Sequence, residues 1–151
     1  MPIIDKRHVK VGLKAETSEE VLRAVGQMLR DTDCVKDTFV DAVIERESVY
    51  PTGMNLKYNA IAMPHTFPEH VNRPGIALVK LDKPVTFMHM GSTGEEVHAE
   101  MIFMMAITNP EEQIKNLKKV MMVFMDETIV KKFRDAKDEE ELYNLGKKYL
   151  E

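Results

Sequence analysis

Two apolar segments in the middle of the chain, residues 75–81 and 97–108, limit the possible folds more than any other feature. The first is almost continuously aliphatic. The second begins with polar His98 and Glu100 on one face and then becomes apolar on both faces. Strands that are apolar on both faces are buried on both sides, as in a sheet covered by helices. We therefore expect residues 97–108 to form a central strand that runs from solvent into the core.

Helical patterns flank these segments. Thr17-Ser18-Glu19-Glu20 fits a capping box, and apolar residues follow it at helical spacing as far as Leu29. Asn109-Pro110 and the two glutamates after it predict a second helix start. The apolar stripe expected on that helix is Ile114, Leu117, Met121 and Phe124. Further helices are expected over residues 37–49, 126–134 and 138–150.

The order of helices, then strands, then helices predicts the fold class. Strands are expected over residues 8–13, 60–63, 75–81, 85–88 and 97–108. Lys83-Pro84 is expected to separate two of them, because proline cannot donate a ladder hydrogen bond. In 151 residues this order predicts one domain over residues 1–151, of the α/β (α+β) class, with a mixed β-sheet flanked by helices.

Charge and hydropathy exclude two kinds of partner. The net charge is −4 with both signs interspersed, so nucleic acid, which attracts a basic face, is not expected as a ligand. No apolar run approaches the roughly 18–20 residues of a membrane-spanning helix. Residues 1–7 lack the apolar segment of a signal peptide. We therefore expect a cytoplasmic protein.

Cys34 is the only cysteine, which excludes an intrachain disulfide and a zinc site made of thiolates. Its neighbours Asp31, Asp33 and Asp37 are expected to raise the pKa of its thiol. We therefore interpret Cys34 as a structural residue.

His65 is the most prominent of the five histidines because of its local sequence. It follows the predicted strand 60–63 and Pro64, and it opens the polar loop 66–70. Its ring is therefore expected at the end of a strand on a well-anchored backbone, where catalytic groups often lie. An ordinary loop histidine has the same pattern, so from these residues alone both interpretations stay open.

The other histidines form no diagnostic metal-binding pattern. His65 and His70 are five residues apart, which does not place them on one face of a helix. His89 and His98 flank a predicted turn at 91–96. No metal or cofactor is expected, although a hydrolase with a metal bound by His65, His70 and a carboxylate remains an alternative.

Three motifs resemble the signature of the fructose/mannitol type of enzyme IIA, a component of the bacterial phosphoenolpyruvate-dependent sugar phosphotransferase system. They are Glu45-Arg46-Glu47, Pro51-Thr52-Gly53-Met54 and Asn59-Ala60-Ile61-Ala62-Met63-Pro64-His65. Met63 stands where the family has isoleucine. The resemblance covers nearly the whole chain and implies the fold of the mannitol-type enzyme IIA.

The resemblance also implies roles for individual residues. His65 is the phosphorylated histidine, which suits a neutral imidazole as a nucleophile near pH 7. Arg46, whose position alone indicates only compensation of a helix dipole, pairs with the phosphoryl oxygens or orients the site. The implied route runs from HPr phosphohistidine to His65 and then to a cysteine of a separate enzyme IIB. Membrane enzyme IIC is an indirect partner.

Two departures resemble the galactitol-type enzyme IIA. Gln113 stands where many members carry a second site histidine, and His70 is not general in the fructose/mannitol group. The resemblance implies that both bind phosphate or orient the site, and that the transported sugar is galactitol or a similar polyol. A regulatory module of the nitrogen-related type is the alternative. That type usually keeps the second histidine.

Overall fold

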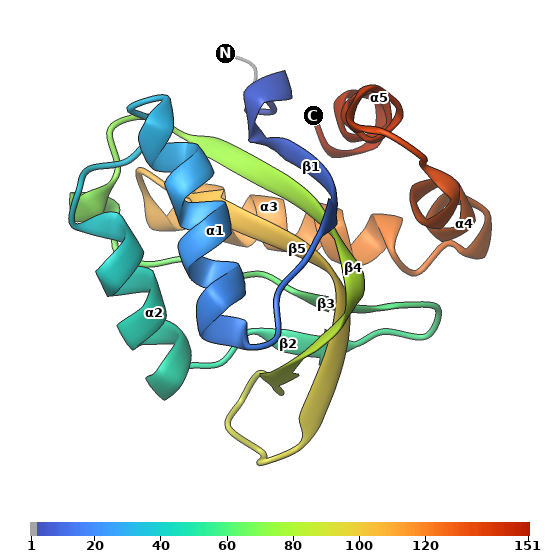
Figure 1. Ribbon diagram of the computed structural model, residues 1–151, viewed down its shortest axis with the longest axis horizontal. Helices are drawn as coiled ribbons and strands as arrows, with labels where there is room; N and C mark the ends of the chain where they lie inside the picture. Colours follow the sequence, from blue (N-terminus) through green and yellow to red (C-terminus); the bar gives the residue numbers. More distant parts are fainter. Residues whose placement is uncertain (1–2) are drawn as a thin grey trace.

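The computed structural model describes residues 3–151 and contains one five-stranded mixed sheet with helices on both faces (Figure 1). The strand order is β1-β4-β5-β3-β2. β1 pairs with β4 and β3 with β5 in parallel, and the other neighbours are antiparallel. The strands are β1 (Val9–Leu13), β2 (Gly53–Asn55), β3 (Ala60–Ala62), β4 (Gly75–Met88) and β5 (Glu96–Ala106). The predicted mixed sheet flanked by helices is confirmed.

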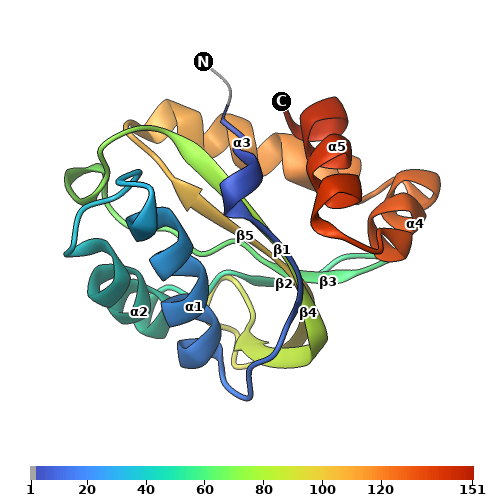
Figure 2. The same ribbon diagram turned by 45° about the horizontal axis from the view of Figure 1, so that its top comes forward.

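Two of the five α-helices in this range cover one face of the sheet and three cover the other (Figure 2). α1 and α2 pack on the first face, and α3, α4 and α5 pack on the second. Their bounds are α1 (Ser18–Asp31), α2 (Phe39–Val49), α3 (Pro110–Val123), α4 (Glu127–Asp135) and α5 (Glu139–Leu150). Short 3-10 turns cover Lys6–His8 and Pro68–His70. No helix within residues 3–151 has the length and apolarity needed to cross a bilayer.

The side chains of β5 show why helices must cover both faces of the sheet. Met101, Phe103 and Met105 belong to the core under α3–α5, whereas Ile102 and Met104 belong to the core under α1 and α2. All five side chains are almost fully buried. Because successive side chains of a strand point to opposite faces, one apolar segment supplies both cores. The predicted central strand with a solvated beginning is therefore confirmed.

The helix starts follow the predicted caps. The Thr17 hydroxyl accepts from the Glu20 backbone N–H (3.2 Å), and the Glu20 carboxylate accepts from the Thr17 N–H (2.9 Å). The Asn109 side chain accepts from the Glu112 N–H at 3.0 Å. These contacts satisfy backbone donors that the first turn of a helix leaves free.

Two predictions about the elements were wrong, and one strand was not foreseen. The two strands expected at 75–81 and 85–88 form one strand, β4, whose pairing shifts register between Lys80 and Val85. The irregular pairing accommodates Pro84, which has no N–H to donate. Strand β2 was not predicted, because Pro51-Thr52-Gly53 indicated only a break. Ile114 is 55% exposed and does not belong to the buried stripe of α3, whose buried residues are Val120 and Val123.

Cys34 is buried, and its Sγ–H donates to the carbonyl oxygen of Arg73 (3.3 Å). The pKa of its thiol is raised, as expected, but mainly by burial and not by the neighbouring aspartates. This environment fits the predicted structural role.

Gly53, the first residue of β2, lies where a side chain does not fit. A Cβ at this position would lie 2.6 Å from the Met88 carbonyl oxygen and 2.9 Å from Val97 Cβ. The close approach joins β2 to the β4–β5 hairpin, since the Met90 N–H donates to the Gly53 carbonyl oxygen (2.8 Å). The glycine of the Pro-Thr-Gly motif is therefore required by packing.

We expect Gly53→Ala to lower the free energy of unfolding by about 2 kcal/mol, because backbone atoms must move to make room. Urea unfolding followed by circular dichroism measures this change. Gly26→Ala is the matched control and should be about as stable as the wild type. Its Cβ would meet the half-buried side chain of Val40 (3.0 Å) and no backbone atom nearer than 3.8 Å, and alanine gains about 1 kcal/mol of helix propensity in α1. A Gly53→Ala protein as stable as the wild type would contradict this packing argument.

Candidate functional site

His65 lies just beyond the end of β3, where two strands fix the backbone. The Pro64 carbonyl oxygen accepts from the Met105 N–H of β5 at 2.9 Å. The His65 side chain is largely buried, with 8% of the residue exposed. The position at the end of a strand thus agrees with the sequence analysis, whereas the degree of burial was not foreseen.

The hydrogen-bond partners of the His65 ring determine its tautomer. Nδ1 lies 3.0 Å from the Met63 carbonyl oxygen, which can only accept, so Nδ1 carries the proton. Nε2 lies 2.7 Å from Nε2 of Gln113, whose amide group donates to it. Burial lowers the pKa of His65 and the charge of Arg46 lowers it further, while the bond to Met63 opposes both. The ring is therefore a neutral imidazole with its lone pair on Nε2.

Gln113 reaches His65 from the first turns of α3. The Glu112 carboxylate accepts from both the N–H (2.9 Å) and the hydroxyl (2.8 Å) of Thr108, which fixes the junction between β5 and α3. The fold thus joins two predicted site residues that are 48 positions apart in the sequence.

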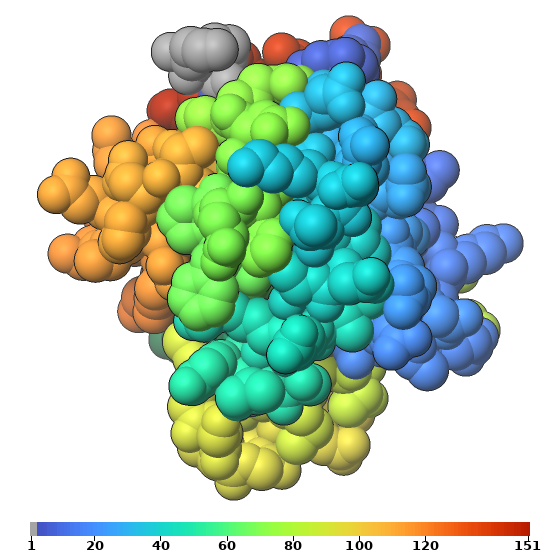
Figure 3. Space-filling model, turned by 90° about the vertical axis from the view of Figure 1, so that its left-hand side faces the viewer, coloured from blue at the N-terminus to red at the C-terminus, as the bar shows by residue number. Residues whose placement is uncertain are grey.

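Arg46 lies in the last turn of α2, between two aromatic rings. Its guanidinium carbon is 4.8 Å from the ring centres of both Tyr50 and Phe67. No carboxylate within residues 3–151 lies at ion-pair distance from it. Figure 3 shows this face, where the segment after β3 (green) lies between α2 (teal) and the start of α3 (orange). Among the described residues Arg46 thus has no ion-pair partner and is held by stacking beside the site.

His70 is separated from the His65 ring. Its Nδ1 lies 2.8 Å from the Thr38 hydroxyl, and its carbonyl oxygen accepts from the Lys36 N–H (2.8 Å). It lines a cavity of about 220 Å³ together with Arg46 and Phe67. His70 therefore belongs to the surroundings of Arg46 and has no hydrogen bond to His65 or Gln113.

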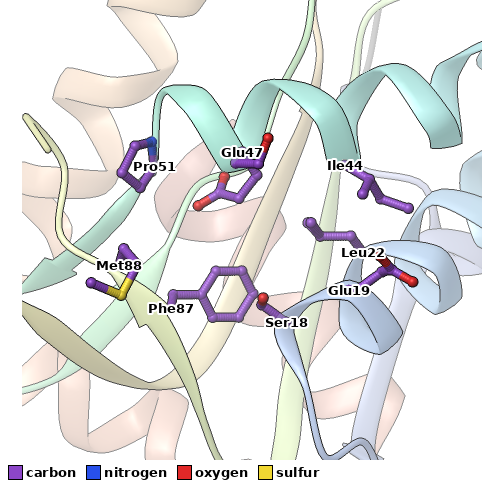
Figure 4. A pocket seen from close by; sticks show the side chains of 9 residues that line it. Ser18, Glu19, Leu22, Ile44, Glu47, Pro51, Phe87 and Met88 are labelled. Carbon is purple, nitrogen blue, oxygen red and sulfur yellow. The ribbon is translucent and has the colours of Figure 1, made fainter. Parts of the chain in front are cut away.

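Glu47 and Thr52 form a buried pair that the sequence analysis missed. The Glu47 carboxylate accepts from the Thr52 N–H and from the Thr52 hydroxyl, both at 2.8 Å. Glu47 is only 8% exposed, and burial raises its pKa to about 7. Figure 4 shows its side chain beside a cavity of about 220 Å³, bordered by Pro51, Phe87 and Met88.

A pattern in the sequence contained the signal for Glu47. Phe39, Val43 and Glu47 are four residues apart, so they lie along one face of α2, and all three are buried. A charged residue on a buried helix face needs hydrogen-bond partners, and Thr52 supplies them. Helical spacing therefore predicts that the Glu47 side chain is buried in the protein.

The histidines do not form a metal site. His70, His89 and His98 each lie beside a threonine hydroxyl, and among residues 3–151 no three His, Cys, Asp or Glu side chains are placed to hold a metal ion. The alternative of a metal bound by His65, His70 and a carboxylate therefore has no ligand set in this part of the chain.

Comparison with known proteins identifies a matching family and similar proteins. The family model described as "Phosphoenolpyruvate-dependent sugar phosphotransferase system, EIIA 2" matches residues 2–149. The galactitol-specific EIIA component of Escherichia coli K12 is 30% identical over 110 residues, 73% of each chain. The mannitol-specific enzyme IIA component of Bacillus subtilis 168 is 27% identical over 145 residues, 94% of each chain.

A solved structure matches the fold. In a complex of enzyme IIAMTL and phosphorylated enzyme IIBMTL from E. coli, the matched chain has a TM-score of 0.73 and 22% identity, with 92% of this chain and 93% of that chain covered. The chain therefore has the mannitol-type fold that the sequence motifs implied.

We expect Glu47→Gln to change how stability depends on pH. The folded state holds the Glu47 proton up to a pKa of about 7, whereas the unfolded state releases it near pH 4.5. The wild type therefore loses stability as pH rises through this interval, by up to about 3 kcal/mol, and the glutamine variant does not. Urea unfolding at pH 5, 6, 7 and 8 measures the difference between the two proteins.

The matched control is Glu45→Gln, which changes an exposed glutamate of the same helix and should keep the wild-type pH dependence. A stability difference between wild type and Glu47→Gln that stays constant from pH 5 to pH 8 would refute the assignment of a buried, proton-binding carboxyl group.

Proposed function

The chain belongs to the EIIA 2 family of the phosphoenolpyruvate-dependent sugar phosphotransferase system, and we propose that it carries a phosphoryl group on Nε2 of His65 between two partner proteins. The observation that supports this proposal is the state of the ring. Nδ1–H is bound to the Met63 carbonyl oxygen, which leaves the lone pair on Nε2. A neutral imidazole oriented in this way is a nucleophile at neutral pH without a separate base.

The proposed reaction consists of two substitutions at phosphorus. In the first, the Nε2 lone pair attacks the phosphorus of phosphohistidine on HPr, the donor P–N bond breaks, and its electron pair returns to the donor nitrogen. In the second, a cysteine thiolate of enzyme IIB attacks the same phosphorus, and the electron pair of the P–N bond returns to Nε2. Both steps need positioning and charge stabilisation more than covalent help.

Arg46 and Gln113 are the proposed partners of the phosphoryl oxygens. Arg46 has a free guanidinium group beside the site, and guanidinium binds phosphoryl oxygens through paired hydrogen bonds. Once the Nε2 lone pair is bonded to phosphorus, the Gln113 amide can donate to a phosphoryl oxygen instead. His70 lies in the Arg46 cavity, so we assign it to the orientation of that side of the site.

The proposed acceptor lies on a separate chain. Cys34 is buried with a raised thiol pKa, so it does not supply the thiolate that the second step needs. Enzyme IIAMTL of E. coli is known in a complex with phosphorylated enzyme IIBMTL, which supports an enzyme IIB as the partner. We propose that the system served, with enzyme IIC in the membrane, takes up galactitol or a similar polyol, because a galactitol-specific component is among its relatives.

We expect the intact mass of the protein to increase by one phosphoryl group after incubation with phosphoenolpyruvate, enzyme I and HPr. His65→Ala should remove the increase while circular dichroism stays unchanged. His98→Ala, the matched control, should keep it because His98 is exposed at the beginning of β5 and its ring bonds to the Thr86 hydroxyl. A wild-type protein without a mass increase, while a known enzyme IIA is phosphorylated under the same conditions, would overturn the proposed function.

We expect Gln113→Ala to slow phosphoryl uptake by about 10- to 100-fold, the effect of losing one hydrogen bond to a charged group. Gln113→Glu should slow it more, because a carboxylate repels the phosphoryl oxygens. Gln113→His should recover most of the rate, because imidazole also offers an N–H. Rapid-quench measurement of phosphorylated protein gives the three rates, and equal rates in all variants would place Gln113 outside the reaction.

A further inference from the structure

Glu47 and Thr52 do not contact the His65 ring, yet hydrogen bonds connect them to it. We propose that ionised Glu47 is a positioning residue, which holds His65 in its reactive tautomer through Thr52 and the backbone of Met63. A proton on Glu47 would then slow phosphoryl uptake. This inference rests on the proposed role of His65 as phosphoryl acceptor.

The connection begins at the carboxylate. Thr52 donates its hydroxyl proton to Oε1 of Glu47 and its backbone N–H to Oε2. The hydroxyl oxygen keeps its lone pairs and accepts from the Met63 N–H at 3.2 Å. The Met63 N–H also points to the Thr52 carbonyl oxygen at 3.3 Å. Thr52 thus links Glu47 at the end of α2 to the residue that follows β3.

Met63 continues the connection to the ring. Its N–H is fixed by Thr52, and its carbonyl oxygen accepts from Nδ1 of His65. The next carbonyl, that of Pro64, is fixed by Met105. The orientation of the Met63 carbonyl therefore depends on Thr52 on one side and on β5 on the other. That carbonyl is the group that keeps the proton on Nδ1 and the lone pair on Nε2.

The charge state of Glu47 sets the direction of these hydrogen bonds. An ionised carboxylate only accepts, so it takes the Thr52 hydroxyl proton and leaves the hydroxyl oxygen free for Met63. A protonated Oε1 is itself a donor, and the Thr52 hydroxyl then loses the acceptor for its own proton. The ionised form gives both Thr52 donors and the Met63 N–H an acceptor.

The surroundings of Glu47 allow this change of charge. The cavity beside it is lined by Ser18 and Glu19 from α1, by Ser48 from α2 and by apolar side chains (Figure 4). Glu19 pairs with Arg23 at 3.5 Å. Among residues 3–151, the only other charged residue in the cavity wall is thus an acid, so no cation there holds Glu47 ionised. The raised pKa of Glu47 agrees with this environment and places its protonation near neutral pH.

The chain offers a matched set of variants for the test. Glu47→Gln removes the charge, Thr52→Val removes the hydroxyl at constant shape, and Thr52→Ser keeps it. Ser48→Ala is the control, because Ser48 lines the same cavity but its hydroxyl donates to the Glu45 carbonyl oxygen. Two readouts are measured for each: the rate of phosphoryl uptake from phospho-HPr between pH 6.5 and pH 8, and the ¹⁵N shifts of the His65 ring nitrogens.

For wild type and Ser48→Ala we expect a rate that falls as pH drops through about 7, and a ring protonated on Nδ1. For Glu47→Gln and Thr52→Val we expect a rate at pH 8 about 10- to 100-fold lower, the effect of a misplaced reacting group. We also expect their rates to lose the inflection near pH 7 and their rings to carry part of the proton on Nε2. Thr52→Ser should restore both readouts.

The stability of Glu47→Gln separates positioning from a structural role. A residue that only supports the fold loses rate and stability together, whereas this variant should lose rate while it gains stability above pH 7. Unchanged ring shifts and rates in folded Glu47→Gln would overturn the inference, even if Thr52→Val does not fold. A wild-type protein that takes up no phosphoryl group would overturn the proposed function instead, and the ring shifts would still decide whether Glu47 controls His65.

Discussion

The site depends on the hydrogen bond from Nδ1–H of His65 to the carbonyl oxygen of Met63. Because a carbonyl oxygen only accepts, this one contact selects the tautomer and leaves Nε2 with its lone pair. Every other contact of the ring follows from that choice. Gln113 meets a lone pair and therefore donates its amide proton, and burial without an acidic partner keeps the ring neutral. The fold thus holds His65 as a neutral imidazole with its lone pair on Nε2, the form that the proposed reaction needs.

The layers of the fold bring the surrounding residues together. Helix α2, which carries Arg46, covers one face of the sheet, and α3, which carries Gln113, covers the other (Figure 1). His65 follows β3 and contacts Gln113. The apolar strands must be covered by helices on both faces of the sheet. For this reason, helices from both faces reach the same end of the sheet. Gly53 allows β2 to pack closely against the β4–β5 hairpin, and the adjacent Thr52 lies beside Met63.

The sequence predicts the parts of the fold that local chemistry controls. The capping box at Thr17, the Asn109 cap and the doubly buried strand β5 depend on near neighbours and on periodicity, and all are present. The continuous strand β4 and the short strand β2 depend on pairing with other strands, whereas in the sequence the proline and the Pro-Thr-Gly motif indicate only breaks. The residues of the candidate site also fall into two groups, those that local sequence indicates and those that depend on the folded chain. Local context indicated His65, but the contact of Gln113 with His65 and the burial of Glu47 exist only in the folded chain.

Burial gives Glu47 a cost in stability above pH 7, where it is ionised, and gives His65 one only as the pH falls, where its ring is protonated in the unfolded chain. A carboxylate in a low-dielectric environment without a cation costs free energy above pH 7, and a buried imidazole resists protonation as the pH falls. An apolar residue at position 47 would pack in the core under α2 without this cost in free energy, as Phe39 and Val43 do on the same face of the helix. A charged group in such a place is explained when its hydrogen bonds hold something else in position. The two hydrogen bonds from Thr52 to Glu47 are connected through Met63 to the ring of His65. The free energy that ionised Glu47 costs the fold is therefore explained by its proposed role in positioning His65.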